Sequence, residues 1–267
     1  MKANISVLVI QGQVLKTYLS LPFDKLGVLN KLFNYFMGIY IKILVLLRFS
    51  LKFLCYYIFM DKSHHVIEIY KLLHNLYPNA VTFLDFKSPY QLMIAVILSA
   101  QTTDAQVNKV TPELFLQYPH PEDLQSAKVE EVEKIIRPTG FYKVKTRNIM
   151  GAAKEVLLKY NSIVPELMED LLTLPGVGRK SANVIRAHCF NKPAIIVDTH
   201  FSRVVKRLGL TSSSNPVIIE SDLVQITDKT IQTDFSMVVN IHGRSCCTSR
   251  NPSCEKCILN SLCRNSI

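Results

Sequence analysis

The chain has few charged residues and few glycines for its length, and these shortages exclude several classes of protein. Charged residues make up 19% of the 267 positions and apolar residues 48%, which is too much buriable surface for an intrinsically disordered chain. Nine glycines and twelve prolines exclude a collagen-like or linker-like composition. Alternating apolar runs of the strand type are almost absent, so we predict an all-α protein.

Acidic residues are also scarce relative to basic ones. The chain has 31 Lys and Arg against 21 Asp and Glu, a formal net charge of +10, which indicates a polyanionic partner, either nucleic acid or an anionic membrane surface. Residues 1–59 hold +6 of this charge, so the rest of the chain holds only +4. The argument for DNA therefore depends on local placement, and we expect contributions from Lys145, Arg147, Lys206 and Arg207.

Residues 1–59 form a basic, hydrophobic leader that differs from the rest of the chain. Within it, residues 39–59 are almost wholly apolar and long enough to span a bilayer, but Arg48 near the centre costs about 3 kcal/mol. Three interpretations compete: a poor membrane anchor, an ordered helical extension, and an upstream reading frame wrongly joined to the gene. We favour the third, because a conventional soluble helix starts after Met60, and we expect no membrane contact by residues 39–59.

The seven cysteines are an odd number, which argues against a fully paired disulfide framework. No cleavable secretory signal is evident, which disfavours disulfides further. Five cysteines fall within the last 22 residues, and such clustering indicates a metal site. The spacing Cys247-x6-Cys254-x2-Cys257-x5-Cys263 suits four thiolate ligands of either zinc or a 4Fe-4S cluster, and from spacing alone both remain open.

A turn with two glycines, Gly176-Val177-Gly178, joins a short predicted helix to a second helix that opens at Arg179. Such a turn lets backbone N–H groups face outward at a helix N-terminus, where the helix dipole favours an anion such as a phosphate. We therefore expect Gly176, Val177, Gly178 and Arg179 to contact the DNA backbone without reading bases. The alternative is that any corner between two helices needs glycines.

Lys180 and Asp198 are the candidate catalytic residues. Lys180 lies in the first turn of its helix, where the dipole disfavours an ammonium and so favours a neutral amine, a nucleophile for a sugar carbon. The alternative is a solvated surface lysine. Asp198 ends an apolar run before a predicted helix over residues 199–208 and is placed to cap it. A capping carboxylate is fixed in direction and, aimed into a cleft, can also stabilise positive charge at a sugar C1′ or act in proton transfer.

Taken together, these stretches resemble the endonuclease III family of DNA glycosylases with AP-lyase activity, within the helix-hairpin-helix superfamily. The resemblance runs from about Met60 to Cys263 and is carried by residues 99–104 (SAQTTD), 174–184 (LPGVGRKSANV), 197–200 (VDTH) and 242–244 (HGR). It implies two α-helical lobes. One is a six-helix lobe over residues 82–193 that contains the hairpin, and the other is a cluster lobe made of residues 60–81 and 194–267.

The resemblance also implies a base excision repair enzyme that removes oxidised pyrimidines and cleaves the strand 3′ to the abasic site by β-elimination. Lys180 would attack C1′ and form a Schiff base, and Asp198 would assist. The implied ligands of a 4Fe-4S cluster are Cys247, Cys254, Cys257 and Cys263.

Three further residues are expected to contact DNA by the same resemblance. Gln101 would fill the gap left by the extruded base, and Phe141 aligns with a wedge position, although the alternative for it is an ordinary core aromatic. His200 is expected to contact DNA next to Asp198.

The expected partner is double-stranded DNA with damaged or abasic sites, with no obligate protein partner. We expect a monomer in the cytoplasm, associated with the nucleoid if the source is prokaryotic. Two other functions share part of this pattern. An adenine mismatch glycosylase shares the hairpin and the cluster but usually lacks a lysine at the position of Lys180 and carries an extra C-terminal domain. A noncatalytic helix-hairpin-helix DNA-binding protein would have no need of Lys180 and Asp198.

Overall fold

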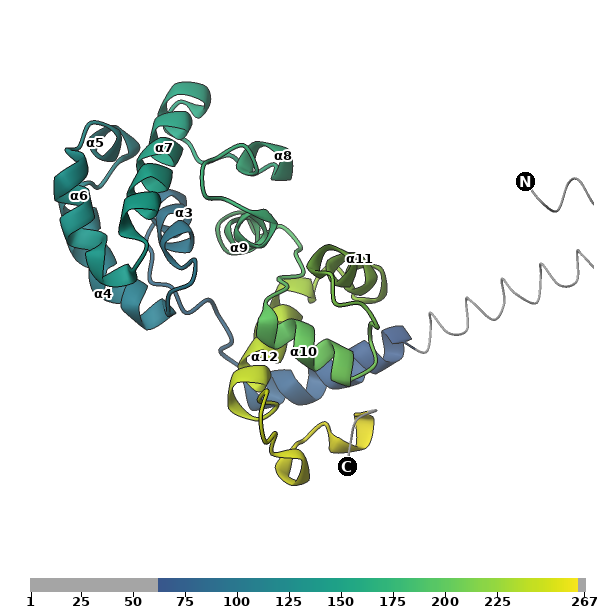
Figure 1. Cartoon of the computed structure of the whole chain (residues 1–267). Helices are drawn as coiled ribbons and strands as arrows, with labels where there is room; N and C mark the ends of the chain where they lie inside the picture. The colour runs from purple at the N-terminus through teal and green to yellow at the C-terminus, as the bar shows by residue number, and fades with distance from the viewer. Residues whose placement is uncertain (1–61, 264–267) are drawn as a thin grey trace, which may run out of the picture. The chain divides into compact units, whose positions relative to one another are not determined.

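The computed structural model describes residues 62–263, and this part of the chain is helical with no strands (Figure 1). The all-α prediction is therefore confirmed for it. The chain divides into two units, Met1–Phe59 and Met60–Ile267. The predictions for the leader, including residues 39–59, lie outside the described residues. Between residues 62 and 263, no helix is long and apolar enough to cross a membrane.

The described part opens with a helix over residues 62–76, and short connections join the later helices. Several of these helices have a side-chain cap; α3, for example, starts with Ser88 Oγ accepting a hydrogen bond from the backbone N–H of Gln91, followed by a first-turn proline. The α-helices are α3 (Pro89–Leu98), α4 (Asp104–Gln117), α5 (Pro121–Gln125), α6 (Val129–Ile136), α7 (Tyr142–Tyr160), α8 (Met168–Leu171), α9 (Arg179–Phe190), α10 (Thr199–Arg207), α11 (Pro216–Ile226) and α12 (Gln232–Ser245). The 3-10 helices are η1 (Arg137–Thr139), η2 (Cys254–Lys256) and η3 (Asn260–Leu262).

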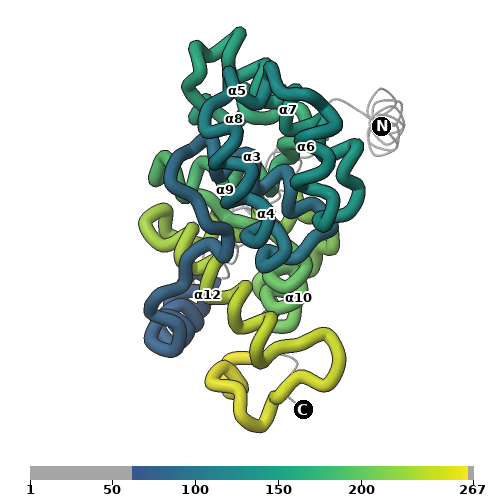
Figure 2. The backbone as a smooth tube through the Cα atoms, turned by 90° about the vertical axis from the view of Figure 1, so that its left-hand side faces the viewer, coloured from purple at the N-terminus to yellow at the C-terminus, as the bar shows by residue number. Residues whose placement is uncertain are grey.

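Two separate groups of buried apolar side chains define two helical lobes. The first core is built from α3 to α9 and contains side chains such as Leu92, Ile136 and Ile149. The second is built from residues 62–76, residues 194–197 and helices α10 to α12. The two groups of helices occupy the upper and lower parts of Figure 2, with the yellow cysteine-containing loop at the bottom. The two-lobe architecture is confirmed for the described residues.

Helix α9 belongs to both lobes. Its residues Ala182 and Ile185 lie in the first core, Ala187 lies in the second, and Val184 packs against both. The helix that begins with Arg179 and Lys180 is therefore held from two sides, and its start is fixed relative to both lobes.

The extended segment over residues 194–197 is buried, and its backbone polar groups are paired by side chains from α9 and α12. Asn183 Nδ2 donates to the carbonyl of Ile195 at 3.2 Å, and Ser236 Oγ accepts from the N–H of Ile196 at 3.0 Å. Both side chains are buried. Since buried backbone groups need partners, these two bonds set the register of the segment that ends at Asp198.

Gly176, in the turn before α9, is required by both its conformation and its surroundings. Its φ is +81°, and a Cβ there would lie 2.9 Å from Ile97 Cγ2 and 3.0 Å from Asn148 Cβ. The neighbouring Gly178 has nothing within 4 Å of such a Cβ. The two glycines of the turn therefore have different structural roles.

We expect Gly176→Ala to lower the free energy of unfolding by about 2 kcal/mol or more, because a left-handed conformation and overpacking both penalise the methyl group. Gly178→Ala, the matched control, should cost less than about 1 kcal/mol. Urea unfolding followed by circular dichroism measures both. Equal losses in the two variants would contradict the close approach at Gly176.

Candidate active site

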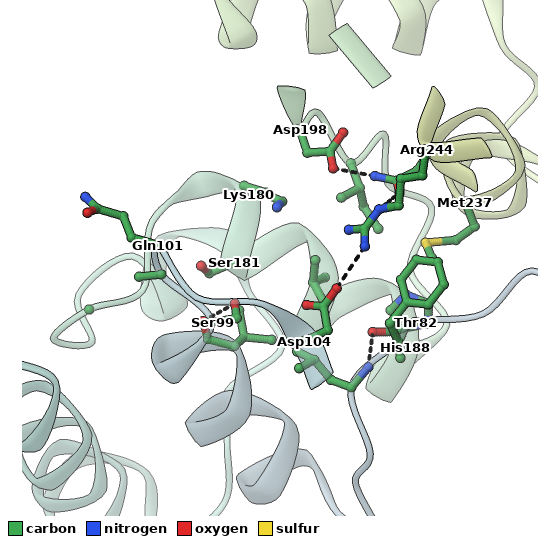
Figure 3. A pocket seen from close by; sticks show the side chains of 18 residues that line it. Thr82, Ser99, Gln101, Asp104, Lys180, Ser181, His188, Asp198, Met237 and Arg244 are labelled. Atoms are coloured by element: carbon green, nitrogen blue, oxygen red, sulfur yellow. Dashed lines mark hydrogen bonds and ion pairs between the residues drawn. The ribbon is translucent and has the colours of Figure 1, made fainter. Parts of the chain in front are cut away.

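Lys180 and Asp198 face the same pocket. Lys180 is the second residue of α9 and is exposed, and Asp198 is the N-cap of α10 and is partly buried. Both line a pocket of about 250 Å³ and an adjoining one of about 620 Å³. Figure 3 shows the two side chains around the first pocket, with Ser99 and Asp104 coming from the first lobe and Arg244 from α12. The fold thus brings together the two residues predicted to carry the chemistry.

Both carboxylate oxygens of Asp198 accept hydrogen bonds. Oδ1 accepts from the backbone N–H of Phe201 at 2.7 Å, which confirms the predicted cap of α10. Oδ2 accepts from Nδ2 of Asn240, on α12. The carboxylate is therefore fixed in direction, and it also lines the pocket.

In the glycine turn, the two glycines are exposed to solvent, whereas Val177 and Arg179 have partners within the protein. Gly176 and Gly178 are exposed, but the side chain of Val177 lies in the first core and its N–H donates to the carbonyl of Leu174. The guanidinium of Arg179 forms a two-point ion pair with Glu220 of α11 at 2.7 and 2.9 Å, which raises its pKa. The backbone at the two glycines is the part of the turn left open to an anion.

Gln101 and Phe141 lie on two exposed loops and share an unusual backbone conformation. Their φ angles are +54° and +48°, in the left-handed region that side-chain-bearing residues rarely adopt. Phe141 is 67% exposed, so the alternative of an ordinary core aromatic is wrong. Two exposed side chains on strained loops are typical of residues that act on a ligand rather than on the core.

Lys145 lies inside the protein between these two loops, so the expectation that it contacts DNA is wrong. It is 3% exposed, and its Nζ donates to Thr102 Oγ1 at 2.5 Å and to the carbonyl of Thr139 at 2.9 Å. Burial lowers its pKa. The ammonium joins the residue after Gln101 to the turn that precedes Phe141, and it thereby sets the spacing of the two loops.

Lys206 and Arg207, two basic residues of α10, also have partners within the protein. The guanidinium of Arg207 donates to the carbonyl of Thr248 at 2.8 Å and to Cys247 Sγ at 3.2 Å, so it is directed at the cysteine loop and not toward a DNA backbone. Lys206 is exposed and bonds Ser214 Oγ. His200 is partly buried, accepts from Arg203 at 3.3 Å, and lines the larger pocket.

The cysteine loop follows α12 and has the donor set for an anionic cluster. Cys247, Cys254, Cys257 and Cys263 are all partly buried. Arg203 donates to the carbonyl of Cys247 at 3.0 Å, in addition to the contact of Arg207 with the sulfur. Two guanidinium groups beside the loop suit the negative charge of a cluster held by four cysteine ligands.

A fifth thiol and a histidine lie beside this set. The ligand atoms of His242, Cys246 and Cys257 all lie within 4.8 Å of one another, and His242 Nε2 is 3.4 Å from Cys257 Sγ. Burial lowers the pKa of His242. Cys246 is thus close to the loop's other thiols, although the sequence predicts no role for it.

Asn240, Asn183 and Ser236 are site residues that sequence reasoning missed. All three are buried amides or hydroxyls that hold Asp198 or the segment before it. For one of them the sequence contains a signal. Asn240 lies four residues before Arg244 of the HGR stretch, so the two side chains share one face of α12. Nothing in the sequence indicates that this face meets Asp198.

Comparison with known proteins defines the class. Residues 94–229 match the family described as HhH-GPD superfamily base excision DNA repair protein, and residues 247–263 match the iron-sulfur binding domain of endonuclease III. Endonuclease III of Synechocystis sp. is 45% identical over 204 residues, which cover 76% of this chain and 93% of the relative. Endonuclease III of Escherichia coli K12 is 38% identical, with 76% and 96% covered.

A solved structure of a non-covalent endonuclease III–DNA complex superimposes with a TM-score of 0.73 at 39% identity, covering 76% of this chain and 96% of that one. A thermostable thymine-DNA glycosylase, at 24% identity and a TM-score of 0.69, shares the fold. The chain belongs to the endonuclease III family of base excision repair enzymes, the DNA glycosylases with AP-lyase activity. Its cofactor is a 4Fe-4S cluster, which decides between the two metal groups that the cysteine spacing left open.

Proposed function

We propose that this enzyme excises oxidised pyrimidines from double-stranded DNA and nicks the strand at the resulting abasic site, with Lys180 as the nucleophile. The observation that carries the proposal is the placement of the Lys180 amine and the Asp198 carboxylate on one pocket. The two groups start adjacent helices, α9 and α10, and buried hydrogen bonds fix the segment between them. A nucleophile and an oriented carboxylate at one site are what the reaction needs.

The target nucleotide must leave the base stack before Lys180 can reach its C1′, because both C1′ and the glycosidic bond are inaccessible within the duplex. Gln101 and Phe141 are exposed and placed on neighbouring loops that Lys145 joins. We assign Gln101 to the gap left by the extruded base and Phe141 to the wedge. A polar and an aromatic side chain together replace the hydrogen bonds and the stacking of the lost nucleotide.

The chemistry then follows from the Lys180 amine and a fixed carboxylate. The Lys180 nitrogen bonds to C1′ as the C1′–N glycosidic bond breaks, and the base departs with its electron pair and takes up a proton. Asp198, whose carboxylate is oriented by two hydrogen-bond donors, stabilises the positive charge that develops at C1′. Ring opening leaves a Schiff base, loss of a C2′ proton breaks the C3′–O bond, and hydrolysis of the resulting Schiff base frees the lysine.

Binding of the DNA backbone is assigned to the N-terminus of α9. Gly176 and Gly178 are exposed there, and the positive end of the helix dipole attracts a phosphate. Val177 supports the turn through the first core, and the exposed Arg179 supports it through its ion pair with Glu220. His200, on the larger pocket, is placed to meet the strand beside Asp198. We expect the enzyme to act as a monomer in the cytoplasm, without an obligate protein partner.

Cys247, Cys254, Cys257 and Cys263 would hold the 4Fe-4S cluster. Such a cluster cross-links a loop that has only the short helices η2 and η3 of its own, and Arg203 and Arg207 tie that loop to α10. The role we assign to it is structural, and the positive side chains around the loop fit the negative charge of four thiolates.

Lys180→Ala should abolish both covalent trapping by borohydride and strand nicking on abasic DNA, while binding to DNA survives, because the amine is the only group lost. Lys128→Ala, which removes an exposed lysine of the first lobe, is the control and should behave as wild type. Gel assays and fluorescence anisotropy measure these properties. Undiminished nicking by Lys180→Ala would refute the nucleophile, and a wild-type chain that forms no adduct would indicate a noncatalytic DNA-binding protein.

Asp198→Asn should lower the rate of base excision and nicking by roughly a hundredfold or more, since it removes the negative charge from the pocket. Asparagine is a good N-cap, so the thermal stability should hardly change. Asp198→Ala loses the cap as well and should in addition cost about 1 kcal/mol of stability. If Asp198→Asn kept full activity, the residue would be a cap alone.

Cys257→Ser should lose bound iron and the visible iron-sulfur absorbance, because one cluster ligand is removed. Cys246→Ser, at the neighbouring thiol, should retain both. Iron analysis and absorbance spectra of the purified variants decide this. Loss of iron from Cys246→Ser but not from Cys247→Ser would reassign the first ligand to Cys246.

A further inference from the structure

Asn240 of α12 lies between the Asp198 carboxylate and the guanidinium of Arg244. We propose that Asn240 is a positioning residue for the reaction: its amide holds the carboxylate of Asp198 toward the pocket, and Arg244 in turn holds the amide. The inference rests on the proposed function, because it assigns to Asn240 an effect that passes through Asp198.

The contacts of Asn240 leave its amide one orientation. Its Nδ2 donates to Asp198 Oδ2, and its Oδ1 accepts from Arg244 Nε at 2.9 Å. A guanidinium can only donate and an ionised carboxylate can only accept, so the amide oxygen must face Arg244 and the amide nitrogen must face Asp198. The side chain is 8% exposed, and little water competes for either bond.

Arg244 is itself fixed from the other lobe. Its Nη1 is 3.2 Å from Oδ2 of Asp104, at the start of α4 (Figure 3). Its guanidinium carbon lies 4.6 Å from the centre of the Phe83 ring. A chain of hydrogen bonds therefore runs from Asp198 through Asn240 and Arg244 to Asp104, along the wall of the pocket. Because Asp104 lies three residues after Gln101, this chain of hydrogen bonds also joins the Gln101 loop to the second lobe.

A short amide can reach Asp198 only because α10 and α12 approach closely. Gly243 makes this possible: a Cβ there would lie 3.1 Å from His200 Cβ and 3.2 Å from the His200 carbonyl oxygen. Gly243 is three residues after Asn240, on the same face of α12. Gly243, the glycine of the HGR stretch, therefore allows the close approach of α10 and α12 that lets Asn240 reach Asp198.

The choice of a neutral donor has a chemical consequence. An arginine or lysine in direct contact with Asp198 would compensate the negative charge that the reaction needs at C1′. An amide orients the carboxylate and leaves its charge uncompensated, while the positive charge of Arg244 is one side chain away and is paired with Asp104. Orientation and charge are therefore supplied by separate groups.

The test is the single-turnover rate of nicking on preformed abasic DNA by Asn240→Leu, which keeps the side-chain size and removes both hydrogen bonds. The rate should fall about 10- to 100-fold, the range expected for loss of a hydrogen bond to a charged group. Affinity for DNA that contains a non-cleavable tetrahydrofuran abasic analogue should stay within about twofold. Gln232→Met is the matched control, because it removes another buried amide of α12 whose partners are the carbonyls of Thr227 and Val224.

A double-mutant cycle with Asp198→Asn separates positioning from general destabilisation. If Asn240 acts through Asp198, adding Asn240→Leu to Asp198→Asn should cause little further loss of rate. Asn240→Asp keeps the shape of the side chain and can still pair with Arg244. It should also be slow, because it replaces the donor to Asp198 with a carboxylate that repels it. This variant provides the test if Asn240→Leu does not fold.

Three outcomes overturn the inference: wild-type rates in Asn240→Leu or Asn240→Asp, losses that add fully to that of Asp198→Asn, or an equal loss of rate in Gln232→Met. Failure of the proposed function looks different, because then the wild-type chain itself would neither nick abasic DNA nor be trapped on it.

Discussion

The site depends on the sharing of α9 between two hydrophobic cores. One end of the helix carries Lys180 on its exposed first turn, and the body of the helix contributes apolar side chains to both lobes. Because interiors are close-packed and deform little, a helix that is part of two cores cannot rotate relative to either. Asn183, one turn after Lys180, uses the same helix to pair the backbone of Ile195 and so transmits this rigidity to the segment before Asp198.

Three of the basic residues expected near DNA have partners within the protein itself. Lys145 is buried between two loops, Arg179 is paired with Glu220, and Arg207 holds the cysteine loop. Each of these residues shapes the surface that DNA meets and need not contact a phosphate. With the DNA backbone assigned to glycine amides and a helix dipole, as we propose, these cations are free for such structural contacts.

In the mechanism we propose, Asp198 serves stability and chemistry together. The bond from Phe201 caps α10 and that from Asn240 sets the direction of the free side of the carboxylate. A group that is anchored by bonds in the ground state needs no reorganisation when charge develops nearby, which is the physical basis of electrostatic catalysis. Stability and preorganisation thus come from the same pair of hydrogen bonds.

Much of this protein was determined by its sequence alone, because its decisive signals are local. The helical pattern, the glycine turn before Lys180, the cap at Asp198 and the cysteine spacing all depend on residues within a few positions of one another. The tertiary structure alone decided which long-range partners these residues have: Asn240 with Asp198, Lys145 with the two exposed loops, and Arg179 with Glu220. Such contacts join residues far apart in the chain, and they depend on how the helices of the two lobes pack, which no short spacing in the sequence encodes.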